Sequence, residues 1–394
     1  MPTFQLELTS PLFISFASIF VVSARFLQAY PRLFEWLIFS FNLMFLFLIS
    51  HHISNLILII ALAGLVIALA ELRFSLLSES GFFALSVVMC LWILLFVLKD
   101  ADIFVIPWAL PKQGAELIAI VGISYFIFRC ISYFSDVEVI EQRSFIKSLN
   151  YLLFFPTVLA GPIIRYEDYA QRAEKETDWS VTLEALHQIV NGYIKKFIFA
   201  DLLSPAGIFS KGTEHWSLSM LWIGVSLQLF ILYLDFSGYC DIMIGLAKLA
   251  GFRLPANFNY PFLSANIQEF WTRWHITLGG FIKDYVFNPL FRFGLQTLPP
   301  SSIFALTVAT YFFTMLLIAL WHKVSLGFLI FGLIQATALV LFLLKKKYFP
   351  TKSPSIIKLR VAQVFTYFLV SFSMIFWYYG PKDALGIIAA MFGF

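Results

Sequence analysis

Long apolar runs recur along this chain of 394 residues, and they constrain its fold more than any other feature. The hydrocarbon core of a bilayer is about 30 Å thick, and roughly 20 helical residues cross it. A short run at residues 11–24 comes first, and longer runs follow at residues 33–50, 53–70, 81–98, 115–134, 217–234, 301–320, 325–344 and 361–379. This pattern predicts a protein that crosses the membrane many times.

The amino-acid composition also indicates a membrane environment. Hydrophobic residues make up 60% of the chain and charged residues only 13%, whereas soluble domains typically carry about 25% charged residues. Intrinsic disorder is excluded because it requires low hydrophobicity and a high net charge. A net charge of +4 is weak for a nucleic-acid binder of this length, so we expect membrane lipid and no nucleic acid as a partner.

Three less regular apolar pieces, at residues 148–164, 182–203 and 235–251, contain glycine, proline or charge. At membrane depth an unpaired backbone group costs several kcal/mol unless protein or a water-filled cavity satisfies it. We interpret these pieces as broken, re-entrant or amphipathic helices, although a plain loop fits the breakers Pro156, Gly161 and Pro162 equally well. We expect an all-α polytopic membrane protein, a single domain over residues 1–394, with about ten to twelve transmembrane or re-entrant helices.

The distribution of positive charge predicts the orientation, because loops rich in Lys and Arg stay in the cytoplasm. Between residues 344 and 361 the chain has cations and no acid, namely Lys345, Lys346, Lys347, Lys352, Lys358 and Arg360. We place this loop in the cytoplasm. The turn at residues 321–324 then lies in the outer half of the membrane, and Lys323 argues mildly against this.

The most hydrophilic stretch, at residues 165–184, reads as an aqueous loop that opens into an amphipathic helix. Asp178 and Ser180 are candidate N-caps for that helix. Lys195 and Lys196 would mark its cytoplasmic membrane boundary.

A polar segment at residues 235–289 interrupts the apolar pattern and carries several candidate site residues. On a helix that begins near Ser264, the spacing would place Trp271, Trp274, His275 and Leu278 on one face, with Glu269 and Arg273 paired beside them. An interfacial helix with a tryptophan belt is an equally good interpretation of these residues alone.

Trp321-His322 closes a second very apolar run. A lone histidine there would more often be interfacial, but another Trp-His pair lies at 274–275. Two imidazoles can supply a general base and a donor that stabilises charge, as acyl transfer to an alcohol requires. The six histidines form no HxxxH or HExxH pair, so we expect no metal site.

These residues resemble the membrane-bound O-acyltransferase family, in particular its bacterial polysaccharide branch. The similarity extends over residues 121–335. Its motifs are Phe155-Pro156, Ala160-Gly161-Pro162-Ile163, Arg165, Asp235-Phe236-Ser237-Gly238-Tyr239, Asp241, Ile244-Gly245, Gly251-Phe252-Arg253, Pro255, Asn257-Phe258-Asn259, EFWTRWHITL from Glu269 to Leu278, Asp284-Tyr285, Met315-Leu316-Leu317 and Leu320-Trp321-His322. Lys323 stands where the family usually has glycine.

The resemblance implies a shell of helices around a central tunnel, which the acyl donor enters from the cytoplasm and the acceptor from outside. It also implies that His322 is catalytic and that His275 is a second important polar residue. Further candidates for substrate contact or tunnel lining are Trp274, Trp321, Arg273, Tyr239, Asp235, Asn257 and Glu269. We expect His322 to act as the base and His275, Trp274 or Tyr239 to bind the developing oxyanion.

The resemblance further implies a bacterial cytoplasmic membrane location and no tightly bound cofactor. The donor would be an acyl thioester, either acetyl-CoA or an acylated carrier protein, and the acceptor an extracytoplasmic polysaccharide or a relay protein. Motifs favour acetyl transfer, while overall length favours D-alanyl transfer to a teichoic-acid-like polymer. A transporter or flippase is the alternative of another class, since broken helices and intramembrane histidines are common there; a scaffold without activity is a third.

Overall fold

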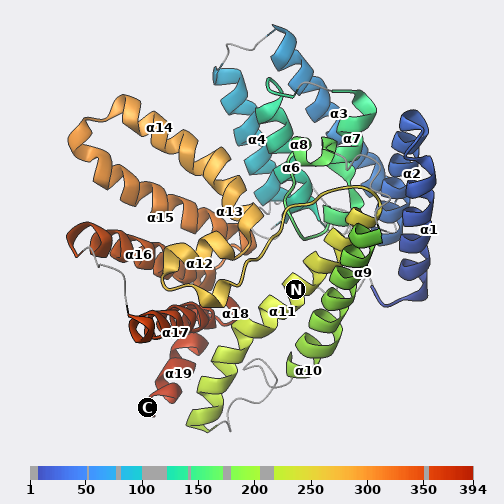
Figure 1. Cartoon of the computed structure of the whole chain (residues 1–394). Helices are drawn as coiled ribbons and strands as arrows, with labels where there is room; N and C mark the ends of the chain where they lie inside the picture. The colour runs from blue at the N-terminus through green and yellow to red at the C-terminus, as the bar shows by residue number, and fades with distance from the viewer. Residues whose placement is uncertain are drawn as a thin grey trace. The chain divides into compact units, whose positions relative to one another are not determined.

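The computed structural model describes residues 8–50, 53–76, 81–99, 122–140, 143–171, 179–204, 217–349 and 355–393 (Figure 1). These residues form helices joined by turns, and an isolated antiparallel β-bridge pairs Phe258 with Trp274. His51, His52, His215, Asp178 and Lys352 lie outside the described residues.

Several helices match the predicted membrane spans. In the described part of the chain, the helices long and apolar enough to cross a bilayer are α2 (Pro31–Ser50), α3 (Ile53–Leu76), α11 (Leu218–Leu249), α15 (Ile303–His322), α16 (Leu326–Tyr348) and the pair α17 (Ile356–Ser373) and α18 (Ile375–Tyr378). Two shorter apolar helices are α1 (Pro11–Leu27) and α4 (Gly81–Lys99). The all-α, multi-pass prediction is therefore confirmed, while the central tunnel stays a prediction.

The chain divides into two compact units, each built from two stretches of sequence. The first contains residues 1–191 and 239–255, and the second contains residues 192–238 and 256–394. Helix α11 belongs to both, because the division falls between Gly238 and Tyr239.

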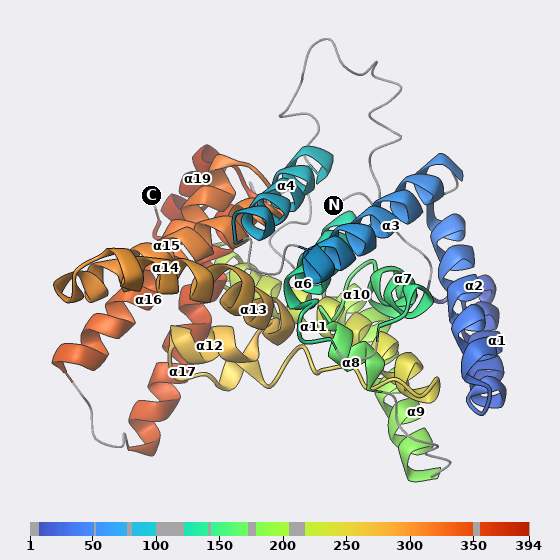
Figure 2. The same ribbon diagram turned by 90° about the horizontal axis from the view of Figure 1, so that it is seen from above.

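The first unit contains α1 to α4, α9 (Trp179–Tyr193) and the short helices α6 (Ile123–Asp136), α7 (Phe145–Leu153), η1 (Phe155–Thr157) and α8 (Tyr166–Ala170). Helices α1 and α2 run side by side (Figure 2). Buried Arg129 on α6 donates to the carbonyl oxygens of Tyr151 at 2.8 Å and Phe154 at 3.4 Å. Since the last carbonyls of a helix lack partners within it, Arg129 stabilises the point where α7 ends.

The second unit contains two π-helical turns, η2 (Ile194–Ala200) and η6 (Lys283–Phe287). It also contains the helices α12 (Ile267–Arg273), α13 (Ile276–Ile282), α14 (Asn288–Thr297), α15, α16, α17, α18 and α19, the last at Pro381–Met391. Short turns α10 (Asp201–Leu203), η5 (Pro261–Leu263) and η7 (Pro300–Ser302) complete it. Its core joins α12, α15, α16 and α17–α19 through residues such as Phe270, Trp274, Ala319, Phe331 and Phe376.

One expected break is absent. For residues 235–251 the sequence suggests a broken, re-entrant or amphipathic helix, but they continue α11 without interruption to Leu249, so the expectation of a break or re-entrant turn is wrong. The glycines there serve close packing. A Cβ on Gly238 would lie 2.7 Å from the carbonyl oxygen of Gly192, and a Cβ on Gly245 would lie 2.7 Å from the carbonyl oxygen of Ala185. Neighbouring backbone thus occupies the space that a side chain would need.

The other irregular pieces do break. Residues 182–203 change from α9 to the π-helical η2, and residues 148–164 leave α7 at Leu153 for η1 and then non-helical chain. Ser180 is not an N-cap, because α9 already begins at Trp179.

Gly332 allows α15 and α16 to pack tightly, which gives a stability prediction. A Cβ at Gly332 would lie 2.8 Å from Ala319 Cβ and 3.1 Å from the Met315 carbonyl oxygen. Gly332→Ala should therefore lower the free energy of unfolding by about 1–3 kcal/mol, as overpacking does, and lower the melting temperature in detergent. Gly64→Ala is the matched control, since nothing lies within 4 Å of that site; an equal melting temperature for both variants would contradict the packing argument.

Candidate functional site

A sharp break separates α12 from α13 at Trp274 and His275. Helix α12 ends at Arg273, Trp274 is extended with φ −101° and ψ 127°, and His275 is left-handed with φ 46° and ψ 53° before α13 begins at Ile276. The predicted continuous helix that places Trp271, Trp274, His275 and Leu278 on one face is therefore wrong. A left-handed residue other than glycine costs about 1–2 kcal/mol, so neighbouring groups must hold this conformation.

A strap at residues 257–259 holds the break through backbone hydrogen bonds. The Asn259 N–H donates to the Arg273 carbonyl oxygen at 2.9 Å, and the Ile276 N–H donates to the Asn257 carbonyl oxygen at 2.9 Å. The isolated bridge between Phe258 and Trp274 lies between these two bonds. Backbone groups that lose their helical partners at the break are thus satisfied, as buried groups must be.

The side chain of Asn257 adds a second set of bonds. Its Oδ1 accepts from the Thr277 N–H at 3.2 Å and from the Thr277 hydroxyl at 2.8 Å, and it lies 3.1 Å from His275 Nδ1. Asn257 is only 2% exposed. One amide oxygen therefore connects the strap to both the imidazole and the first turn of α13.

His275 is enclosed by this arrangement. It is 5% exposed, its ring centroid lies 4.9 Å from that of Phe236, and its Nε2 has no hydrogen-bond partner among the described residues. It lies in the short connection between α12 and α13, outside the six candidate spans. Burial lowers the pKa of the His275 imidazole to about 3, so the ring is neutral in the physiological range.

Glu269 and Arg273 pair as the sequence predicts. Arg273 Nη2 donates to Glu269 Oε1 at 2.7 Å, and the other Glu269 oxygen accepts from the Ala265 N–H at 2.8 Å. Asn266 caps the start of α12 by accepting from the Glu269 N–H at 2.9 Å. Both charged side chains are about one-third exposed, so they stabilise α12 from its outer side.

Trp274 belongs to the aromatic core of the second unit. Its ring stacks on Phe270 at 5.5 Å and meets Phe258 edge-on at 5.2 Å. The extended backbone at the break allows this, because Trp274 and the following histidine no longer occupy adjacent positions on one helix. Trp274 thus packs as a core residue, while His275 lies against Phe236 and the polar strap.

Sequence reasoning missed a buried polar network next to α12. The Trp271 indole N–H donates to Gln335 Oε1 at 3.2 Å, and Gln335 Nε2 donates to Ser373 Oγ at 2.7 Å. Gln335 and Ser373 are fully buried, and the network ties α12 to α16 and α17. A glutamine within an apolar span is costly unless it is paired, and this signal could have identified Gln335.

His322 ends α15 and is surrounded by aromatic rings. Its ring centroid lies 4.3 Å from those of Trp321 and Trp377 and 6.3 Å from that of Phe328. Trp377 comes from α18, which lies close to α16 at Gly327. A Cβ on Gly327 would lie only 2.4 Å from the Phe376 carbonyl oxygen, so the absence of a side chain allows this approach. His322 is half-buried. Nothing in the sequence connects Trp377 with His322.

Asp235 and Tyr239 lie on α11 but belong to different units. Asp235 forms an ion pair with Lys196 of η2, a residue that the sequence suggested only as a boundary marker. The Tyr239 ring packs on Gly161 in the first unit, where a Cβ would lie 3.4 Å from Tyr239 Cε1. The second unit therefore contains all the candidate site residues except Tyr239.

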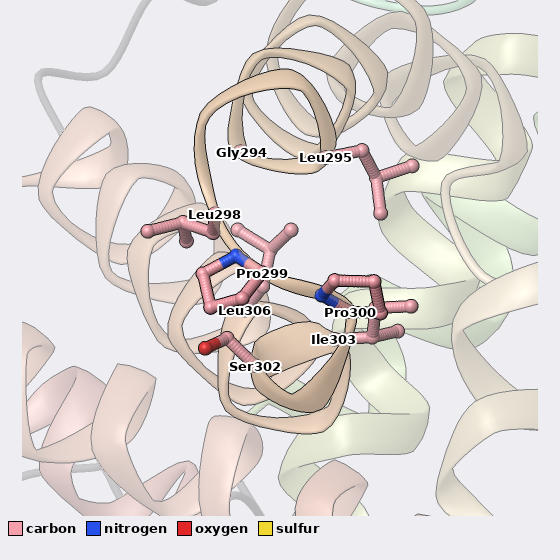
Figure 3. A pocket seen from close by; sticks show the side chains of 8 residues that line it. All are labelled: Gly294, Leu295, Leu298, Pro299, Pro300, Ser302, Ile303 and Leu306. Atoms are coloured by element: carbon pink, nitrogen blue, oxygen red, sulfur yellow. The ribbon is translucent and has the colours of Figure 1, made fainter.

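The small cavity at the α14–α15 turn is separate from these residues. The side chains around it are apolar apart from one serine, and it is lined by Gly294, Leu295, Leu298, Pro299, Pro300, Ser302, Ile303 and Leu306 (Figure 3). It contains no titratable side chain that could serve as an acid or base. Across the described ranges, no group of three His, Cys, Asp or Glu side chains could hold a metal ion.

Comparison with known proteins gives a family match. A family model described as the membrane-bound O-acyltransferase family matches residues 74–379, which include both histidines. The match begins well before residue 121, where the motif resemblance begins.

Individual relatives are about 30% identical to the chain over the matched residues. A probable alginate O-acetylase of Pseudomonas fluorescens is 32% identical over 251 residues, which is 61% of this chain and 48% of the relative. A teichoic acid D-alanyltransferase of Bacillus subtilis is 29% identical over 58% of this chain and 60% of the relative. A peptidoglycan O-acetyltransferase of Helicobacter pylori is 28% identical over 60% of this chain and 50% of the relative. The match thus spans about half the length of the alginate relative.

The left-handed backbone at His275 predicts an unusual order of stability. In a helix interior alanine is better than glycine by about 1 kcal/mol, but at positive φ glycine is better because it has no Cβ. His275→Gly should therefore be more stable than His275→Ala by about 1 kcal/mol in denaturant unfolding. The two variants lose the same imidazole, so each is the control for the other. A more stable alanine variant would indicate a continuous helix.

Proposed function

Because this chain belongs to the membrane-bound O-acyltransferase family, we propose that it transfers an acyl group to hydroxyls on the far side of a membrane. The group would be acetyl, the donor a cytoplasmic thioester, and the acceptor an extracytoplasmic polysaccharide or a relay partner. The chain is a multi-pass membrane protein, and we place it in the bacterial cytoplasmic membrane.

One observation carries the proposal. Two Trp-His pairs lie in the same unit, each where a helix ends, and the elements that carry them share one core that contains Trp274 and Ala319. His275 is buried and neutral, whereas His322 is half-buried between aromatic rings. Two imidazoles in such different surroundings suit a reaction in which one group moves a proton and another binds a substrate group.

The reaction needs few groups. His322 in its neutral form accepts the proton of the acceptor hydroxyl as that oxygen attacks the thioester carbonyl carbon. The carbon–sulfur bond then breaks, and the imidazolium returns the proton to the departing thiolate, so that an ester and a thiol are formed. The oxyanion that forms between these steps needs a hydrogen-bond donor, for which the sequence nominates His275, Trp274 and Tyr239.

Acetyl transfer is favoured by the two O-acetylating relatives, named for alginate and peptidoglycan. D-Alanyl transfer from a carrier protein to a teichoic-acid-like polymer is the second candidate. The observation in its favour is the similarity to the teichoic acid D-alanyltransferase, of which the match spans 60%. In either case we propose a diffusible thioester, acetyl-CoA or an acylated carrier protein, and no tightly bound cofactor.

Thiol release by the purified protein tests the proposal. Labelled acetyl-CoA and, separately, a D-alanyl carrier protein are incubated with the protein in lipid, and the free thiol is measured with and without a polysaccharide acceptor. We expect release from the acetyl donor, and a loss of about 10²–10⁴-fold in the His322→Ala variant, which is the usual effect of removing a general base.

The control is His187→Ala, which removes an exposed histidine of α9 and should leave the rate unchanged. Release from the D-alanyl donor alone would favour the second candidate. Normal release by a correctly folded His322→Ala variant would refute the role of His322, and no release from either donor would refute the proposed transfer.

A further inference from the structure

The hydrogen bonds of Asn257 determine which end of its amide is oxygen. A backbone N–H can only donate, and the N–H of Thr277 points at the Asn257 side-chain atom at 3.2 Å. That atom must therefore accept, so it is the oxygen and not the NH₂ group. The amide orientation follows from a fixed donor and does not depend on the histidine.

The same oxygen determines the position of the proton on His275. His275 Nδ1 lies 3.1 Å from it, and a nitrogen without hydrogen would bring its lone pair against those of the oxygen. Nδ1 therefore carries the hydrogen and donates. In a neutral imidazole only one nitrogen is protonated, so Nε2 has a free lone pair.

The ring is held in its neutral form by its surroundings. It is 95% buried against Phe236 and the strap, and burial disfavours the charged imidazolium. The neutral form requires Nε2 to accept a hydrogen bond, yet Nε2 is buried without a partner among the described residues. Leaving such a group unpaired costs about 1–3 kcal/mol, which is typical of a site that a ligand completes.

We propose that Asn257 is a positioning residue, which holds His275 as its Nδ1–H tautomer and so presents the Nε2 lone pair to the substrate. The group that binds there is a hydrogen-bond donor, either a hydroxyl of the acceptor or an amide N–H of the thioester arm. This assignment of a partner rests on the proposed acyl transfer. It revises the expectation that His275 binds the oxyanion, because an oxyanion needs an N–H and this nitrogen has none.

The backbone of Asn257 contributes to the same geometry. Its carbonyl oxygen accepts from the Ile276 N–H at 2.9 Å, while its side chain binds the ring and Thr277. Asn257 thus binds the His275 ring and the two residues that follow it, Ile276 and Thr277, which fixes the backbone at the start of α13 and the direction of the ring together. A residue that only fills space would not determine the tautomer.

Nitrogen NMR of the histidines tests the tautomer without any substrate. The full chain is labelled with ¹⁵N-histidine and placed in lipid bilayers, and the His275 signals are identified by their loss in a His275→Gln sample. We expect a protonated, pyrrole-type Nδ1 and an unprotonated, pyridine-type Nε2 at neutral pH. An Nε2–H signal or a doubly protonated His275 ring in the wild-type protein would overturn the proposal.

Variants separate Asn257 from its neighbours. Asn257→Leu keeps a similar volume but removes the acceptor, so we expect the Nδ1–H preference to be lost. Thr277→Val is the matched control, because it removes the hydroxyl that donates to the same oxygen at 2.8 Å and leaves the histidine bond in place; its spectrum should keep the wild-type pattern. An unchanged tautomer in a folded Asn257→Leu protein would show that Asn257 does not set it.

The transfer assay identifies the group that binds Nε2. We expect Asn257→Leu to raise KM by up to about tenfold, the equivalent of one hydrogen bond, for the substrate that donates to Nε2. A rise for the thioester alone indicates its amide, and a rise for the polysaccharide alone indicates a hydroxyl. Unchanged KM values for both would overturn the substrate assignment. Absence of any transfer would refute the proposed function but not the tautomer, which the spectra decide.

Discussion

The side-chain oxygen of Asn257 is the single acceptor on which the geometry of the second unit's polar site depends. It binds His275, the Thr277 backbone and the Thr277 hydroxyl at the point where the chain leaves one helix and begins another. Together with the two backbone bonds of the strap, these bonds offset the cost of left-handed backbone at a residue that carries a Cβ. Because of the break between α12 and α13, Trp274 packs in the aromatic core, whereas its neighbour His275 lies next to the polar strap.

The two histidines differ because their surroundings differ. His275 is enclosed, with one nitrogen bound to an amide oxygen and the other without a partner among the described residues. His322 is half-buried at the end of α15, and the rings of Trp321 and Trp377 lie against it. A half-buried histidine that an incoming group can reach is suited to proton transfer, whereas an enclosed neutral one is better suited to orient a substrate group. This contrast argues for different roles of the two histidines in the proposed acyl transfer.

Much of the fold could be predicted from the sequence. Runs of apolar residues identified the membrane helices because length and hydropathy are enough for a span, and the spacing of Glu269 and Arg273 was enough for their ion pair. Glycines were less informative. Gly238 and Gly245 suggested a broken helix, but in α11 they serve close approach of neighbouring backbone, and only the packing partner distinguishes the two cases.

The break at His275 could not be predicted for a related reason. Local spacing favours a continuous helix from residue 264 onward, and the competing bonds come from Asn257 and Asn259, many positions earlier. Two further contacts join residues that are distant in the sequence, namely the ring contact of Trp377 with His322 and the hydrogen bond from Trp271 to Gln335. The sequence therefore nominated residues for the candidate site, but the partners of each depend on tertiary packing.

A double-mutant cycle between Asn257 and His275 tests the central claim most directly. The free energy of unfolding is measured for the wild-type protein, Asn257→Ala, His275→Ala and the double variant. If the amide oxygen and the imidazole act as one unit, the two losses will not add, and the coupling energy will be about 0.5–3 kcal/mol. Strict additivity of the two substitutions would contradict the account.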